Sequence, residues 1–369
     1  MLTSKQKHAK ALSLEPYSDR TEMPVYPQLC ATAGALGGKT QAEIFNSTDV
    51  WLESVDAAIK LVGKPDMGFS DGPGDAAFGM GMVCRAPGRE LGEDELYQFL
   101  ELPYIKDPEE YKTINQVGYG KWRMRYLMDI QTPALTDPGQ LFAKFAQVGQ
   151  NSAKVRQFYE ERDIVISAYA STMPIFDALS LYRTMTDYVC DLYDEPGLVM
   201  DIINNWQEEE TEATIGRVKA TGGDRVAIFA MRSSAAFVSP DMFDEFVWPA
   251  LKRMMQMYRE AGILSVLHAD SDWLPMLGHL TELPKGSVHV ELDDATDIVA
   301  AYDILRGSQS MRGNVPSYLF AYKNPDDIRE YCEPLVQMGM KGGFILGSGC
   351  DVPLNAKPEN VKALIDMVR

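Results

Sequence analysis

From about residue 150 onward the sequence alternates short apolar runs with longer amphipathic stretches, and this rhythm constrains the fold more than any other feature. The apolar runs that are typical of buried strands lie at 164–169, 226–230, 263–267, 288–292, 309–312 and 344–346. Helical patterns separate them at 177–193, 196–221, 239–261, 296 onward, 325–338 and 358–368. Repetition of a strand followed by a helix gives a parallel sheet with helices packed on it.

A closed barrel fits this pattern better than an open dinucleotide-binding sheet. No turn after a predicted strand carries a GxGxxG motif that opens a helix. The length of 369 residues suits one barrel. We therefore predict an α/β fold, a single (β/α)8 TIM barrel over 1–369. It has an N-terminal extension over 1–45 and a proline-containing, loop-rich insertion over 79–150 that covers one end of the core.

Composition and charge exclude several classes of protein. The formal net charge of −18 repels phosphate backbones, so we expect no nucleic-acid partner. No uninterrupted apolar stretch is long enough to cross a membrane, and the first ten residues lack the apolar core of a signal peptide. The five cysteines have no CxxC spacing, which favours reduced thiols. We expect a cytoplasmic protein without a membrane partner.

His268 and Cys350 are the strongest candidates for a functional site. His268 follows the apolar run at 263–267, and Cys350 follows the run at 344–349. Active sites of parallel barrels are built at the carboxyl ends of the strands, so we expect the two side chains to meet. Each residue alone is more often a packed side chain than a ligand. As a pair, an imidazole and a thiolate form half of a zinc site.

Four further residues near strand ends complete the candidate site. Asp270 points the same way as His268 on an extended segment, so it is either a third metal ligand or a partner that orients the imidazole. Glu291 is a fourth candidate ligand, or the acid of a salt bridge at the rim. Tyr169 and Arg232 are expected to face the same mouth and bind substrate. Arg232 would orient a carboxylate or phenolate there, or pair with a neighbouring acid.

Several motifs resemble the uroporphyrinogen decarboxylase superfamily. The Arg-Gly-Asn-Val-Pro run at 312–316 is similar to a strand end of that superfamily, and the segment 343–353 followed by 357–361 is similar to its closing motif. The segments 191–196 and 238–243 resemble it as well. The resemblance extends over roughly residues 160–369 and is weak before residue 150. It implies a single (β/α)8 barrel.

This superfamily contains a heme-pathway decarboxylase and zinc-dependent corrinoid methyltransferases. Several of the methyltransferases carry His-x-Cys after one strand and another Cys after the last. His268 and Cys350 match this pattern, but Asp270 stands where the middle cysteine would be. An oxygen ligand leaves the metal more electrophilic, which suits activation of an ether better than activation of a thiol. The decarboxylase needs clustered arginines, and Arg20 is the only arginine in the first 84 residues, which disfavours decarboxylation.

The segment 86–99 is similar to relatives from anaerobic O-demethylase systems. Those proteins move a methyl group from a phenyl methyl ether such as veratrole, guaiacol or vanillate to the corrinoid (cobalamin) of a separate partner protein. The resemblance thus implies a methyltransferase with zinc on His268, Asp270 and Cys350, with a homodimer as one possible assembly. Two alternatives remain. One is transfer from a methylcorrinoid to a thiol or tetrahydrofolate, and the other is a non-catalytic tetrapyrrole- or corrinoid-binding barrel.

Overall fold

Seven strands form one continuous parallel sheet in the computed structural model, which describes residues 2–369. The strands lie in the order β1-β11-β10-β9-β8-β7-β6, so neighbours in the chain are neighbours in the sheet and the last strand returns to the first. They are β1 (Val25–Gln28), β6 (Ser171–Thr172), β7 (Arg225–Ala230), β8 (Leu264–Ala269), β9 (Val288–Leu292), β10 (Ser310–Val315) and β11 (Phe344–Asp351).

Two short strands, β2 (Met67–Gly68) and β5 (Val165–Ile166), close this sheet into a barrel. They pair with each other in parallel. The amide of Asp66 donates to the carbonyl of Val25 at 2.9 Å, which joins β2 to β1. On the other side, β5 continues through 167–170 into β6, which pairs with β7. β5 and β6 are therefore two halves of one barrel strand, and the predicted (β/α)8 barrel is confirmed.

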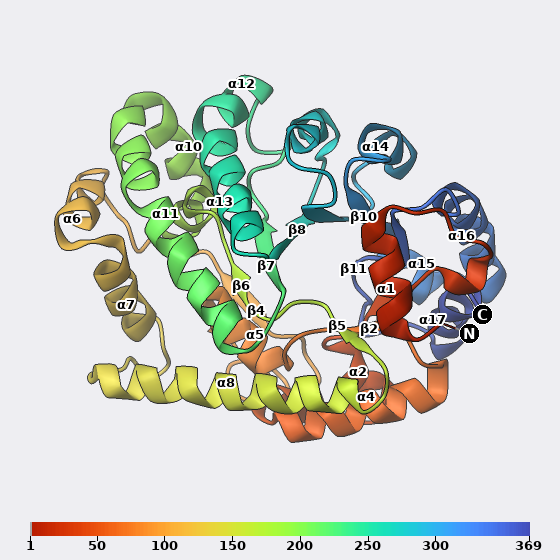
Figure 1. Cartoon of the computed structure of the whole chain (residues 1–369). Coiled ribbons are helices and arrows are strands. Elements are labelled where there is room, and N and C mark those ends of the chain that lie inside the picture. The colour runs from red at the N-terminus through yellow and green to blue at the C-terminus, as the bar shows by residue number, and fades with distance from the viewer. Residues whose placement is uncertain (1) are drawn as a thin grey trace.

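Helices surround the barrel and cover the apolar outer faces of its strands (Figure 1). None of the helices in residues 2–369 is both long enough and apolar enough to cross a membrane. Outside the segment 73–160 they are α1 (Ser4–Ser13), α2 (Thr32–Leu36), α3 (Gln41–Asn46), α4 (Thr48–Val62), α9 (Ile175–Tyr182), α10 (Met185–Asp194), α11 (Pro196–Ala220), α12 (Pro240–Met242), α13 (Trp248–Glu260), α14 (Ile298–Leu305), α15 (Ser317–Tyr322), α16 (Pro325–Gly339) and α17 (Pro358–Asp366), with a 3-10 helix at Leu274–Glu282.

The segment 79–150, which we expected to be loop-rich, is largely helical. After α5 (Pro73–Met80) it forms a hairpin of β3 (Val83–Arg85) and β4 (Gln98–Leu100), then α6 (Glu109–Val117), α7 (Tyr119–Asp129) and most of α8 (Pro138–Glu160). Its prolines mark helix starts, where a missing amide costs no hydrogen bond. Pro108 precedes α6, and Pro138 begins α8. The end expected at residue 150 lies inside α8, which packs along α4 (Figure 1).

One end of the barrel is closed by α1. The carboxylate of Asp66, which precedes β2, is almost completely buried there. It accepts a hydrogen bond from Ser4 at 3.0 Å and lies 3.4 Å from the ammonium group of Lys7. Arg369 at the end of the chain reaches the same carboxylate at 3.2 Å. This cluster ties both ends of the chain together, and Figure 1 shows them side by side. The other end, where the strands finish, is left for the candidate site.

Candidate metal centre

The structure brings together three predicted ligands, His268 on β8, Asp270 just after it and Cys350 on β11. One ligand atom from each side chain lies within 4.8 Å of the other two. The Nε2 atom of His268 lies 3.4 Å from Oδ1 of Asp270. Within residues 2–369 this is the single group of three or more histidine, cysteine or acidic side chains with such spacing. It stands at the carboxyl ends of the barrel strands.

The chain turns sharply just after Asp270. Ser271 has a φ of 67°, a left-handed conformation that non-glycine residues seldom adopt. Its amide donates to Oδ2 of Asp293 in the next loop at 2.7 Å, and this bond helps to hold the strained residue in place. Gly349 lets β11 approach the same loop, because a Cβ atom there would lie 3.1 Å from the Cα atom of Asp293. The turn and the glycine together set Asp270 and Cys350 against His268.

Glu291, the fourth predicted ligand, lies on the other ring nitrogen of His268 and is not part of the group of three. Its Oε2 atom is 3.0 Å from Nδ1. Burial raises the pKa of Glu291, but Arg312 and the hydrogen bond from His268 outweigh that effect and lower the pKa to about 2. The carboxylate is therefore charged and accepts the Nδ1 proton. This bond leaves Nε2 facing Asp270, the arrangement by which metal-binding histidines are oriented.

A chain of polar contacts continues from Glu291 around the inside of the barrel to β11. Arg312 is completely buried, with its Nε atom 3.4 Å from Oε1 of Glu291. Its Nη1 group donates to the side-chain carbonyl of Gln28 at 3.2 Å, and the amide of Gln28 donates to Asp351 at 2.8 Å. Asp351 is the neighbour of Cys350. The two ligand-bearing strands β8 and β11 are thus linked through the interior as well as across the mouth.

The group favours a positive charge at its centre. Burial by itself lowers the pKa of His268, but the attraction of Asp270 and hydrogen bonds with Asp270, Cys350 and Glu291 raise it well above the ordinary value. The pKa of Asp270 is lowered, because the attraction and hydrogen bond of His268 outweigh the effect of burial. A proton on His268 can supply that charge. A divalent cation would supply the positive charge equally well, and neutral His268 would bind it through the lone pair of Nε2.

Zinc fits the chemistry of these donors. Its usual ligands are imidazole nitrogen, thiolate sulfur and carboxylate oxygen, and catalytic zinc sites have three protein ligands and one open position. His268, Asp270 and Cys350 provide one donor of each kind. With Asp270 ionised and Cys350 as a thiolate, two negative charges balance the charge of the ion.

Tyr169, predicted to face the mouth, lies nearer the opposite end of the barrel. The barrel strand continues past it to Thr172, whereas the predicted apolar run ends at residue 169. The ring of Tyr169 packs on Gly223, where an added Cβ atom would lie only 2.3 Å from its Cγ atom. The guanidinium group of Arg225, the first residue of β7, lies 5.1 Å from the ring centre. The structure therefore does not place Tyr169 at the mouth, contrary to the prediction.

Arg232 does follow β7 at the carboxyl end of the sheet, but its side chain is paired with protein groups. Its Nη1 group donates to Oε1 of Glu101 at 3.0 Å and to the carbonyl of Ser180 at 2.9 Å. Its backbone amide donates to Asp177 at 2.7 Å. The alternative of pairing with a neighbouring acid is thus the one the structure shows. Through these bonds Arg232 holds the loop after β7 against α9.

Comparison with known proteins identifies the family. Residues 136–369 match the family model for uroporphyrinogen decarboxylase (URO-D), which covers more than half of the chain. The chain belongs to the uroporphyrinogen decarboxylase family. Among solved structures, a methyltransferase from Methanosarcina mazei shares the fold, with a TM-score of 0.72 and 17% sequence identity over 100% of this chain and 98% of that chain. No curated protein matches the sequence.

The segment of the chain that matches the uroporphyrinogen decarboxylase family includes all three candidate ligands. The hairpin of β3 and β4 precedes this segment. Burial raises the pKa of Tyr97, next to β4, and the nearby Cys30 and Asp351 raise it further, which places the phenol beside β11. Tyr97 therefore approaches β11 from a part of the chain that the family match does not include.

Phe229 and Arg312, two neighbours of the ligands, were not predicted from the sequence. Paired register places Phe229 of β7, His268, Glu291 and Arg312 side by side in one layer of the barrel. The ring of Phe229 meets the imidazole of His268 edge-on, 5.4 Å between centres. A sequence signal for the layer exists in β9, where His289 and Glu291 alternate with apolar residues. Such alternation places both polar side chains on one face of the strand, here the barrel interior.

Proposed function

We propose that this protein is a methyltransferase that moves a methyl group from a phenyl methyl ether, such as veratrole, guaiacol or vanillate, to the Co(I) corrinoid of a partner protein. The observation that carries this proposal is the meeting of His268, Asp270 and Cys350 at the mouth of the barrel. The shared fold with a methyltransferase supports it. The acceptor corrinoid, carried by its own protein, docks over that mouth.

The chain's own groups prepare the ether for transfer. Zinc on His268, Asp270 and Cys350 would supply Lewis-acid polarisation of the ether oxygen, which makes the phenolate a better leaving group. Glu291 holds His268 in the tautomer that presents Nε2. Asp270 contributes an oxygen donor in place of a thiolate, which keeps the site electrophilic. The carbon–oxygen bond then breaks as the methyl group passes to the corrinoid, and the phenolate leaves with the bonding electron pair.

Position and exclusion of water are the other contributions of the protein. Phe229 forms an apolar wall directly against His268. Tyr97, between β3 and β4, is largely buried near Asp351 of β11. Holding the reacting groups in line removes much of the entropic cost of bringing them together. Excluding water strengthens the electrostatic stabilisation of the leaving phenolate.

Decarboxylation, the reaction in the family's name, is disfavoured by the position of Arg20. This arginine is the only one before residue 85. Its guanidinium group is paired with Glu333 on α16 at 3.0 Å, so it does not serve the mouth. Transfer to a thiol is disfavoured by the oxygen donor Asp270. A non-catalytic corrinoid-binding barrel would need no stoichiometric zinc, so metal analysis separates it from the proposed enzyme.

The proposal is tested by methyl transfer from a panel of methoxyarenes to a Co(I) corrinoid protein, followed through the cobalt absorption change. We expect His268→Ala and Cys350→Ala each to abolish transfer while circular dichroism shows an intact fold. His279→Ala is the matched control, because His279 is paired with Asp244 and Glu282 outside the ligand group. Undiminished transfer in His268→Ala or Cys350→Ala would overturn the proposal.

A further inference from the structure

A cavity of about 600 Å³ lies at the end of the barrel opposite to the metal centre. It is bounded by α1, the end of α8, β5 and the turn before β7, and Figure 1 shows α1 and β5 at this end. Its volume is within the range of small-molecule sites. None of the three candidate metal ligands lines it, so the proposed function gives this cavity no task.

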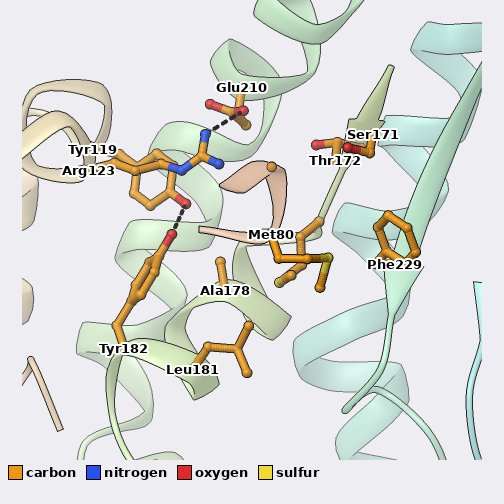
Figure 2. Close-up of a pocket in the computed structure, with 12 residues that line it drawn as sticks. Met80, Tyr119, Arg123, Ser171, Thr172, Ala178, Leu181, Tyr182, Glu210 and Phe229 are labelled. Atoms are coloured by element: carbon orange, nitrogen blue, oxygen red, sulfur yellow. Dashed lines mark hydrogen bonds and ion pairs between the residues drawn. The ribbon is translucent and has the colours of Figure 1, made fainter. Parts of the chain in front are cut away.

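A second cavity, beside the end of β6, is too small for an organic ligand (Figure 2). Its volume is about 30 Å³, room for about one or two water molecules. Figure 2 shows that Arg123 is already paired there with Glu210, and that the hydroxyl groups of Tyr119 and Tyr182 face each other. Of these two cavities, the one at the α1 end is therefore the candidate for a ligand site.

The interruption of the barrel strand at 167–170 leaves room for the larger cavity. β5 pairs with β2 on one side, but on the other side pairing with β7 begins only at Tyr169, whose amide donates to the carbonyl of Arg225 at 3.1 Å. Before that point the Nε group of Arg225 donates to the carbonyl of Ile166 at 3.1 Å. A side chain thus takes the place of a paired strand, and the space beside it stays open.

His8 of α1 is buried against this cavity without a hydrogen-bond partner. It is only 5% exposed and belongs to the cavity wall. The buried side chains of Ser4 and Lys7 on the same helix both bond to Asp66, whereas neither ring nitrogen of His8 bonds to a group in residues 2–369. Burial lowers the pKa of His8 well below its ordinary value, so the ring is neutral and has one N–H group. A buried donor without a partner is destabilising, and a ligand in the cavity would supply the partner.

Further donors in the wall have no partner within the part of the chain that the structure describes. Arg156 of α8 is half-buried and forms no ion pair or hydrogen bond. The hydroxyl group of Tyr169 also has no hydrogen-bond partner. Lys5, exposed at the rim, adds an unpaired ammonium group. Tyr169, which the sequence predicted at the mouth, therefore contributes to the cavity at the opposite end.

The free charge in the wall is positive, in contrast to the molecule as a whole. Three acidic residues also line the cavity. Asp163 is paired with Lys64 at 3.1 Å, and Asp224 is paired with Arg225 at 2.7 Å. Glu160 is then the single unpaired acid against two unpaired cations. Because the formal net charge of the chain is −18, a small anion needs such a local excess of cations to bind.

The remaining wall is apolar, and it indicates what else the ligand contains. Ala9 and Leu12 of α1 face Ile164 and Ile166 of β5 across the cavity. A single inorganic anion would leave this apolar surface uncovered, whereas a ring compound would cover it. A phosphate monoester carries a charge of about −1.5 to −2 and three acceptor oxygens. It therefore suits several converging donors better than a carboxylate, which has two oxygens.

We propose that this cavity binds a phosphate monoester of a small ring compound. The phosphate is held by His8, Arg156 and Tyr169, and the ring lies on the apolar wall of α1 and β5. The inference concerns the end of the barrel remote from the metal centre, so it does not depend on the proposed methyl transfer.

The test is calorimetric titration of the full chain with two phosphate esters, adenosine monophosphate and phenyl phosphate. We expect at least one of them to bind with one molecule per chain. Adenosine, which has the ring without the phosphate, should bind at least about tenfold more weakly, because it lacks the charged acceptor. Benzoate and inorganic phosphate, each with only part of the required chemistry, should also bind more weakly than the ester.

Variants locate the binding. Arg156→Gln and His8→Leu should each weaken binding of the ester by roughly 10- to 100-fold, the effect of losing a hydrogen bond to a charged group. Lys154→Gln is the matched control, because Lys154 lies on the same helix but is paired with Asp49 at 2.8 Å and is not part of the wall. Without ligand, Arg156→Gln should unfold at the same urea concentration as the wild type, since Arg156 has no protein partner to lose. This variant decides the matter if His8→Leu does not fold.

The inference is overturned if neither ester binds, or if adenosine, benzoate or inorganic phosphate binds as tightly as the ester. Equal weakening by Arg156→Gln and Lys154→Gln would also overturn it, because a general loss of positive charge would then explain both. Binding of the ester should be unchanged in His268→Ala. Its loss in that variant would place the phosphate at the metal centre and contradict the inference.

Discussion

Glu291 determines which nitrogen of His268 faces the ligand group. Its carboxylate accepts the Nδ1 proton at 3.0 Å and is itself held by the buried Arg312. Because its pKa is lowered to about 2, Glu291 is an acceptor at every pH at which the protein is expected to be folded. Removing this negative charge would free the ring to turn and would leave Arg312 without its counter-ion.

We predict that Glu291→Gln weakens zinc binding by roughly 10- to 100-fold, the usual effect of losing a partner that orients a metal-binding histidine. Competition with a chromophoric chelator measures this. Glu282→Gln is the control, because Glu282 bonds His279 at 3.3 Å at the surface. Some loss of stability accompanies the change at Glu291, so circular dichroism should confirm the folded state. Zinc affinity equal to that of the wild type would show that Glu291 has no orienting role.

At the scale of single residues, strand-end position is what could be predicted from the sequence. It led to His268, Asp270 and Cys350, which the structure brings together. The rule fails where a strand end is misplaced, as for Tyr169. It is silent about side chains on helices outside the strand-helix repeat.

At the scale of elements, the inner face of β9 carries a prediction about acid. His289 is buried, and burial together with Arg312 and Arg225 lowers its pKa to about 4 despite the opposing attraction of Glu291. The unfolded chain binds this proton near pH 6.5, so stability is present above that pH and is lost as pH falls toward 4. The loss amounts to about 3 kcal/mol, because one pKa unit corresponds to ~1.4 kcal/mol.

Urea unfolding at a series of pH values tests this difference. In His289→Gln the free energy of unfolding should fall less steeply between pH 6.5 and 4 than it does in the wild type. His8 is also buried with a lowered pKa, so part of the slope remains. If the free energy of unfolding depends on pH identically in the variant and the wild type, His289 binds its proton as readily in the folded chain as in the unfolded chain, which contradicts the lowered pKa.

The closure of the barrel by α1 carries a second prediction at this scale. Asp66→Asn should lower the free energy of unfolding by about 3–5 kcal/mol, because it leaves Lys7 and Arg369 beside a neutral group in a buried cluster. Asp366→Asn, which breaks an exposed pair with Lys362, should cost less than ~1 kcal/mol. Denaturant unfolding measures both. Zinc affinity should be unchanged, and equal costs for the two variants would contradict the role given to Asp66.

The alternation of strand and helix patterns after residue 150 was sufficient to predict the barrel, because each repeat consists of a short apolar run followed by an amphipathic helical stretch. Two elements could not be read in this way. The strand of β5 and β6 is interrupted at 167–170, so its apolar run does not show where the barrel strand ends. In the segment 79–150 prolines suggested loops, whereas Pro108 and Pro138 stand at the starts of helices. A proline is equally compatible with both, and only packing decides between them.

At the scale of the whole molecule, the two ends of the barrel have different tasks. One end is closed by α1 and joins the two ends of the chain, while the other holds the candidate ligands. The family match spans 136–369 and includes the ligands, but α5, the hairpin and α7 precede it. The part of the barrel shared with the family thus holds the candidate ligands, and the hairpin that carries Tyr97 comes from the preceding segment.

The most direct test of this account is methyl transfer by the same preparation with and without its metal. Zinc is removed with a chelator, transfer from vanillate to a Co(I) corrinoid protein is followed by cobalt absorption, and zinc is then returned in increments. We predict no transfer by the metal-free protein and full recovery at one zinc per chain, with no recovery in Cys350→Ala. Full activity in the metal-free protein would contradict the central claim.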